Sequence, residues 1–153
     1  MFSKKKLMLL KKFILLTFIY GVIAALPFVS SAQCTSFTKK KCMPEILPYI
    51  HNGQMNTVNL APGESAATKA VFYSGQDYRI LVCPHKILEN VYFEVRTSDD
   101  ALVYSSKESK KDIWNFNVAS TQELNINVFV PAVQSPTGMP QAGCVSVLIG
   151  FKE

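Results

Sequence analysis

The residues that could carry chemistry are few, and the four cysteines are the clearest set among them. Cys34, Cys42, Cys83 and Cys144 are even in number, which in an exported chain predicts two disulfides, because thiols outside the cytoplasm are oxidised. Four cysteines allow three pairings. The short loop from Cys34 to Cys42 is the simplest closure, so we expect that bond together with one between Cys83 and Cys144.

Histidine-dependent catalysis would have to use His51 or His85, the only two histidines. A nucleophile, a base and an orienting group must lie within hydrogen-bond reach of one another. The nearest local grouping is His85 with Glu89, and the sequence has no Gly-x-Ser-x-Gly motif. We therefore predict a non-enzymatic protein with no cofactor and no catalytic residue. A small secreted metal-dependent hydrolase is the weakest alternative.

Metal binding is a second possibility for the same residues. Cys83, His85 and Cys144 could supply three zinc ligands, whereas a structural zinc site needs four. Two disulfides explain these cysteines with fewer assumptions. Turn chemistry explains the aspartates that could bind calcium, which are Asp77, Asp99, Asp100 and Asp112.

Carbohydrate binding would need exposed aromatic rings flanked by polar groups. The candidate rings are Tyr49, Tyr73, Tyr92 and Tyr104, of which Tyr92 and Tyr104 are possible ligand contacts. Trp114 alternates with core positions, which favours burial. The polar groups that could share one sheet face with the rings are Asn115, Asn117, Asn125 and Asn127. A carbohydrate-binding module is therefore an alternative function.

The first 32 residues have the layout of a secretory signal peptide. Five lysines precede an almost wholly apolar run from 13 to 29, and Ser30 and Ala32 supply the small residues of a cut before Gln33. An uncleaved anchor is the alternative, and lipidation at Cys34 is a weaker one. We predict export to the periplasm, the cell surface or the medium, with no membrane insertion after cleavage.

The net positive charge of the chain comes from the lysines of this leader. Of 16 Lys and Arg, 5 precede Gln33, and the remaining 11 balance the 11 Asp and Glu that all follow it. Nucleic-acid binding needs a clustered positive surface. We therefore expect no nucleic-acid partner, and instead an unknown protein or glycan of the cell envelope.

The sequence pattern of the exported part predicts an all-β domain. Residues 33–55 form a disulfide-looped segment with at most a short helix at 45–50, and residues 56–153 form the domain. Eight short β-rich runs separated by turn residues favour a β-sandwich or a β-barrel, and the alternation described next fits an antiparallel β-sandwich. The runs are 57–60, 68–73, 78–83, 91–96, 102–105, 113–118, 124–130 and 144–151.

Alternation of apolar and polar residues assigns the faces of these strands. Along 91–96, 113–118 and 124–130 every second residue is apolar, as expected where one face of a sheet is buried. Cys83 and Cys144 fall on the polar-side faces of their strands. The thirteen residues from 131 to 143 form an unusually long loop, and Thr137 and Met139 are its possible ligand contacts.

A resemblance rests on these strands. The run Gly75-Gln76-Asp77-Tyr78, the hairpin from Val91 to Tyr104 and the closing strand from Gly143 to Gly150 resemble secreted bacterial jelly-roll domains of the pre-peptidase C-terminal type. The likeness is stronger to small exported bacterial proteins of uncharacterised function. It implies a jelly-roll β-sandwich that acts as a binding or structural module.

Overall fold

The computed structural model describes residues 29–132 and 141–152. Contacts divide the chain into two units, Met1–Ala32 and Gln33–Glu153, and the second holds the described strands. In the described ranges no helix combines the length and apolarity that crossing a bilayer requires. The signal peptide falls mostly outside these ranges and stays a prediction.

The described chain contains nine strands, one more than the sequence predicts. The additional strand is the two-residue β1. The strands are β1 Ile50–His51, β2 Asn56–Leu60, β3 Ser65–Phe72, β4 Asp77–Pro84, β5 Tyr92–Thr97, β6 Leu102–Ser105, β7 Ile113–Asn117, β8 Gln122–Phe129 and β9 Gly143–Lys152. All eight predicted runs are therefore strands, with ends shifted by a few residues.

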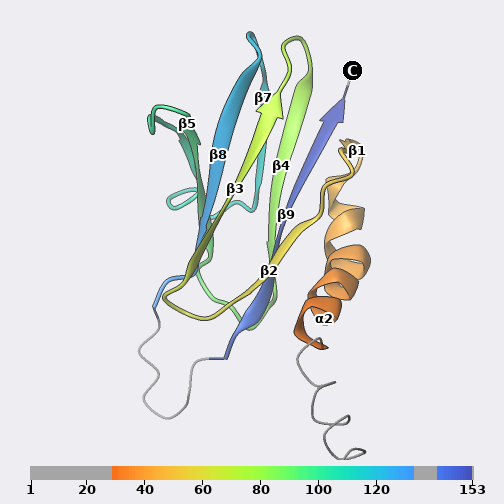
Figure 1. Cartoon of the computed structure of the whole chain (residues 1–153), viewed down its shortest axis with the longest axis vertical. Coiled ribbons are helices and arrows are strands. Elements are labelled where there is room, and N and C mark those ends of the chain that lie inside the picture. The colour runs from red at the N-terminus through yellow and green to blue at the C-terminus, as the bar shows by residue number, and fades with distance from the viewer. Residues whose placement is uncertain (1–28, 133–140, 153) are drawn as a thin grey trace, which may run out of the picture. The chain divides into compact units, whose positions relative to one another are not determined.

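Two antiparallel sheets form a jelly-roll sandwich (Figure 1). The five-stranded sheet has the order β1-β9-β4-β7, with β2 beside β1 on the same edge of β9. The four-stranded sheet has the order β3-β8-β5-β6. From β2 to β9 the chain passes from one sheet to the other at every step except from β5 to β6, as in the two Greek keys of a jelly roll, which confirms the predicted fold class.

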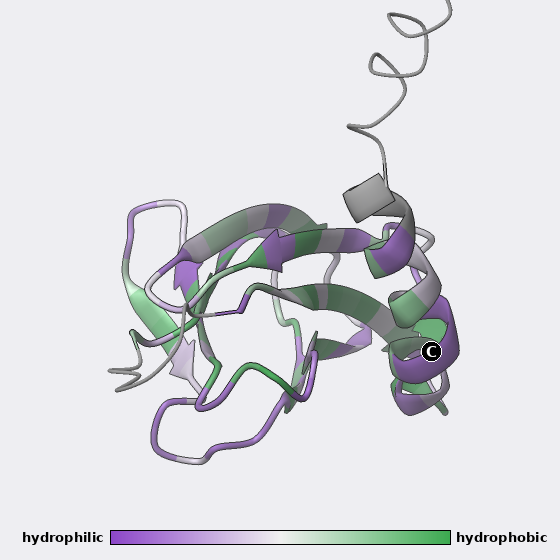
Figure 2. Cartoon of the chain, turned by 90° about the horizontal axis from the view of Figure 1, so that it is seen from below, coloured by the Kyte–Doolittle hydropathy of each residue, from purple (hydrophilic) through white to green (hydrophobic). Residues whose placement is uncertain are grey.

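The core lies between the sheets, on the faces that alternation predicts. Ile80 of β4 pairs with Ile149 of β9, and both side chains are buried against Val95 and Ile126 of the other sheet. Figure 2 shows hydrophobic and hydrophilic residues alternating along the strands. The predicted hairpin at 97–101 is also present, because Thr97 N donates to Ala101 O over 2.9 Å.

Sequence reasoning missed a continuous helical segment before β1. It consists of the α-helix α2 Val29–Phe37, the π-helical turn η1 Thr38–Cys42 and the 3-10 turn η2 Met43–Ile46. Every fourth residue of this segment is buried, at 3% exposed or less: Cys34, Thr38, Cys42 and Ile46. Residues spaced by four do not stay on one face of an α-helix, which has 3.6 residues per turn. The π-helical turn has more residues per turn, so it keeps these residues on the same face.

Residues 33–46 of this segment cover an apolar patch on the outer face of the five-stranded sheet. Leu81 of β4 and Leu148 of β9 are cross-strand partners that point away from the core between the sheets, yet both are 0% exposed. Ile46 and Cys42 pack against them. In Figure 1 the segment, in orange, runs beside β9. Both faces of the two central strands are therefore buried.

The disulfide pairing that we expected is wrong. Cys34 is bonded to Cys144, and Cys42 is bonded to Cys83. Cys83 and Cys144 do lie on the same outer face of neighbouring strands, as alternation predicts. Each bonds to the helical segment because that segment crosses the face on which both sulfurs point.

Two further contacts fix the segment on the sheet. The Thr38 and Ser146 hydroxyls are 2.6 Å apart in a buried hydrogen bond between the two disulfides. The Arg79 guanidinium lies 4.4 Å above the centre of the Tyr49 ring and donates to Leu47 O over 2.7 Å. Residues 33–46 are therefore an integral layer of the domain.

Candidate binding site

The two edges of the sandwich differ in how they are closed. At one edge lie β2 of the five-stranded sheet and β3 of the four-stranded sheet. In the described chain neither strand has a hydrogen-bonded neighbour on its outer side. Unpaired main-chain groups along a strand edge are a template for a further strand. This edge, which we call the β2/β3 seam, presents two such rows.

A groove of about 270 Å³ runs along the β2/β3 seam. Its floor consists of four buried core residues, two from each sheet: Ile126, Val128, Val145 and Val147. Thr57 and Val58 of β2 form one wall, and Ala66 to Thr68 of β3 form the other. The groove therefore offers an apolar floor between two unpaired strand edges.

Small side chains on β3 keep this groove open. The sequence Ser65-Ala66-Ala67-Thr68 places no long side chain over the gap between the sheets. The turn that joins β2 to β3 is fixed to the residue that follows β8, since Gly63 N donates to Val130 O over 2.8 Å and Val130 N donates to Glu64 O over 2.9 Å. The run of small residues is the sequence signal that could have located the site.

Stacked aromatic rings close the opposite edge. Tyr104 of β6 stacks on Trp114 of β7 with ring centres 4.7 Å apart, and Trp114 stacks on Phe116 at 4.0 Å. The first contact joins the two sheets. Because Trp114 lies between two rings, its faces are covered, and it is half-buried against the core. A sugar ring could not stack on it without displacing a neighbour.

A second hollow, of about 700 Å³, lies beside this closed edge. Tyr104, Trp114 and Asn115 line it together with Asp112 and Glu45. Partial burial raises the pKa of Asp112, and the nearby Glu45 carboxylate raises it further. This hollow is larger than the groove. β6 and β7 are also edge strands, but the Tyr104–Trp114 stack bridges them, whereas the β2/β3 seam has an apolar groove between its two strand edges.

Tyr92, a predicted ligand contact, lies on the outer face of the four-stranded sheet. It stacks on Phe129 of the paired strand, with ring centres 5.0 Å apart, and the Lys107 ammonium lies 5.4 Å from its centre. A ligand at this ring would compete with Lys107. Tyr73 is the most accessible of the four candidate rings, at 60% exposed.

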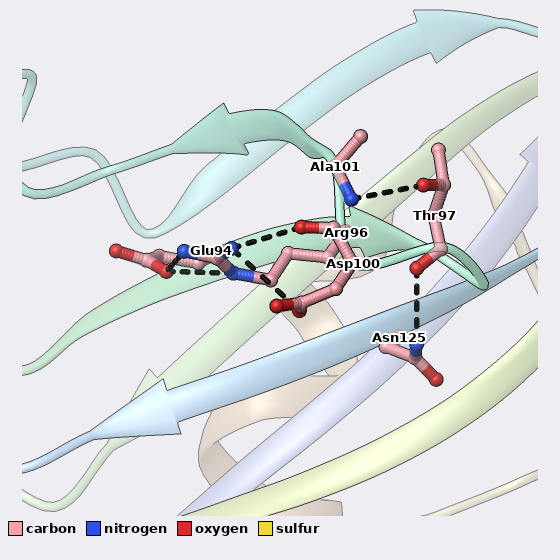
Figure 3. A network of polar contacts seen from close by, with 6 residues as sticks. All are labelled: Glu94, Arg96, Thr97, Asp100, Ala101 and Asn125. Carbon is pink, nitrogen blue, oxygen red and sulfur yellow. Dashed lines mark hydrogen bonds and ion pairs between the residues drawn. The ribbon is translucent and has the colours of Figure 1, made fainter.

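The polar residues on that outer face bond mainly to one another (Figure 3). Glu94 and Arg96 form an ion pair at 2.8 Å, and this hydrogen bond raises the pKa of Arg96. Arg96 also donates to Asp100 O over 3.0 Å, and Asn125 donates to Thr97 O over 3.2 Å. The network ties the hairpin of β5 and β6 to β8, which is a structural role.

The four asparagines do not share one face. Asn115 and Asn117 lie on β7 of the five-stranded sheet, whereas Asn125 and Asn127 lie on β8 of the four-stranded sheet. Both pairs alternate with core residues, so they point outward on opposite sides of the sandwich. The prediction of a single polar face is therefore wrong.

The predicted loop contact and the zinc alternative have different outcomes. Thr137 and Met139 lie outside the described residues, so the predicted loop contact stays a prediction. The zinc alternative is wrong, because Cys83 and Cys144 are in disulfides and have no free thiolate. Among the described residues no group of three or more His, Cys, Asp or Glu could hold a metal ion.

Both histidines bond to the main chain of their own loops. His51 bonds to Gly53 N and Gln54 O, and His85 Nδ1 accepts from Ile87 N at 3.4 Å. Neither bond involves a side-chain nucleophile.

Comparison with known proteins gives a likeness to solved structures but none to a protein family. No protein-family model and no curated protein sequence matches the chain. Among solved structures, the chain is similar to the crystal structure of Aeromonas hydrophila PliG, a periplasmic lysozyme inhibitor of g-type lysozyme. The identity is 9%, the match covers 69% of this chain and 89% of that chain, and the TM-score is 0.48. A likeness of this extent carries no inference about a ligand, and the resemblance to pre-peptidase C-terminal-type domains stays a prediction.

Proposed function

We propose that this chain is an exported, non-enzymatic binding module that takes an extended segment of a partner protein at the β2/β3 seam. One observation carries the proposal: an apolar groove lies between two strand edges whose outer main-chain groups are unpaired. An added strand would gain main-chain hydrogen bonds from an edge and place alternate side chains on the groove floor. Export is supported by the apolar leader and by the two disulfides.

The β3 edge is the better template of the two. It spans eight residues against five for β2. Its central exposed side chain is Lys69, which lies 3.8 Å from Glu123 in an exposed ion pair. Exposed pairs of this kind contribute only about 0–1 kcal/mol, so a partner can displace Glu123. We expect the incoming segment to be apolar at alternate positions and acidic opposite Lys69.

Site-specific photo-crosslinking tests this proposal. A crosslinking amino acid at Val58 reports on the groove wall, and the same residue at Val103 is the matched control, because Val103 lies on β6 at the opposite edge of the sandwich. Both valines are exposed, at 39% and 47%. We expect a partner of the cell envelope to be captured from position 58 and mapped to an extended segment. Equal capture from both positions would refute the seam as the site.

A charge placed in the groove gives an independent measurement. Val58→Lys should weaken binding of the captured partner by about tenfold or more, since the ammonium would have to be desolvated on an apolar floor. Val103→Lys should leave binding unchanged. Equal affinities of the two variants would contradict the proposal.

A further inference from the structure

The loop between β1 and β2 contains an asparagine followed by a glycine, a pair whose atoms can react with each other. Asn52 and Gly53 are exposed, and Gly53 has a φ of +90° with no atom within 4 Å of the position that a Cβ would occupy. In such a pair the main-chain nitrogen of the glycine can attack the side-chain amide of the asparagine. An open glycine presents no steric barrier to that attack.

The His51 ring contacts the attacking nitrogen. Gly53 N donates a hydrogen bond to His51 Nδ1 over 3.2 Å. The other ring nitrogen, Nε2, lies 3.1 Å from Gln54 O, which can only accept. Both bonds require the same neutral tautomer, with the proton on Nε2 and a free lone pair on Nδ1. The ring is thus oriented to accept a proton from Gly53 N.

A second main-chain group contacts the amide that would be attacked. Gln54 N donates to Asn52 Oδ1 over 2.9 Å, so it polarises the side-chain carbonyl and would stabilise negative charge on that oxygen. The main chain on either side is fixed to β9, since Asn52 N donates to Ile149 O over 2.9 Å and His51 pairs with Gly150. Nucleophile, base and oxyanion donor are therefore held on one short loop.

We propose that Asn52 is a self-catalysed deamidation site, in which His51 is the general base and Gln54 N–H stabilises the oxyanion. Gly53 N loses its proton to His51 Nδ1 and bonds to Asn52 Cγ. The Cγ–Nδ2 bond then breaks, and the nitrogen takes a proton from the imidazolium and leaves as ammonia. The resulting succinimide adds one water molecule and opens to aspartate or isoaspartate.

The product changes the edge of the five-stranded sheet. Residue 52 gains a negative charge, and the isoaspartate form adds a methylene group to the main chain between β1 and β2. Because β1 pairs with β9 through only Ile50 and His51, the altered loop should release this pairing first. This inference does not depend on the proposed partner.

Timed mass spectrometry of the purified, oxidised protein tests the proposal. After incubation in neutral buffer, the tryptic peptide 42–69 reports deamidation at residue 52, with Asn56 and Asn59 as internal references. We expect residue 52 to deamidate faster in the folded protein than in the reduced, denatured chain. An equal or slower rate in the folded protein would overturn the proposal.

Two variants separate catalysis from flexibility. His51→Asn keeps an acceptor oxygen near the place of Nδ1 but removes the base. We expect this variant to deamidate at Asn52 about tenfold more slowly, and only in the folded protein. The effect is smaller than the roughly 100-fold or more that a positioned base contributes in an enzyme. His85→Asn is the matched control and should not change the rate. Gln54→Pro removes the oxyanion donor and should also slow the reaction. If His51→Asn and the unsubstituted protein react equally fast, His51 is not the base.

Discussion

Removal of the Cys42–Cys83 disulfide gives the most direct test of how the helical segment stabilises the domain. The bond joins residues 41 positions apart, which corresponds to about 4 kcal/mol in the chain-entropy model. The Cys34–Cys144 bond spans 110 positions and corresponds to about 5 kcal/mol. Apolar packing of Ile46 on Leu81 and Leu148 remains when either bond is removed. The domain should therefore stay folded with one bond left.

The measurement is equilibrium unfolding of the oxidised protein in urea. We expect the double variant Cys42→Ala with Cys83→Ala to lose about 2–4 kcal/mol of unfolding free energy, and Cys34→Ala with Cys144→Ala to lose more. A tryptic map without reduction checks the pairing first. It should join the peptide that ends at Lys39 to peptide 112–152, and peptide 42–69 to peptide 80–86. Linkage of the Lys39 peptide to peptide 42–69, or a loss below about 1 kcal/mol, would refute the reasoning.

Two further substitutions test the contacts of the helical segment. Gly150→Ala should destabilise the domain by about 1–3 kcal/mol in the same assay, because the added Cβ would lie 2.8 Å from Tyr49 Cβ and 2.9 Å from Ile46 Cγ1; an unchanged unfolding midpoint would contradict this close approach. Asp112 has a raised pKa, so the folded state binds the proton of this carboxyl more tightly than the unfolded chain does. The stability of the fold therefore falls as the pH rises from 3.8, the ordinary pKa of the group, through its pKa in the folded state. Asp112→Asn should therefore be more stable than the unsubstituted protein near neutral pH and gain nothing below 3.8, and a gain that is independent of pH would point to another cause.

The strands could be predicted from sequence because alternation is a local signal. In β8, Leu124, Ile126 and Val128 alternate with polar residues, and all three are buried between the sheets. Eight such runs predicted a β-sandwich or barrel, and the resemblance to secreted bacterial domains implied the jelly-roll type. The strand β1 could not be found in this way, since it has two residues and its pairing with β9 depends on tertiary contacts.

The disulfide pairing could not be predicted because it depends on which layer covers a face. Alternation placed Cys83 and Cys144 correctly on one outer face, but it gave no reason for another layer to cross that face. The reason is the pair Leu81 and Leu148, which stand on the predicted polar side and need burial. The spacing of Cys34, Cys42 and Ile46 by multiples of four was the available sequence signal for a covering helix.

The arrangement of covered and uncovered surfaces supports the proposal that the β2/β3 seam is the binding site. The helical segment covers the outer face of β4 and β9, and the Tyr104–Trp114 stack closes the β6/β7 edge. On the outer face of β5, the Glu94–Arg96 pair satisfies its own charges. β6 and β7 are edge strands too, but what remains without a ring stack across it in the described chain is the groove between the unpaired edges of β2 and β3. Lys69 at the centre of β3 should repel a second copy of the same edge, so the seam is suited to a different chain with an acidic residue at that place.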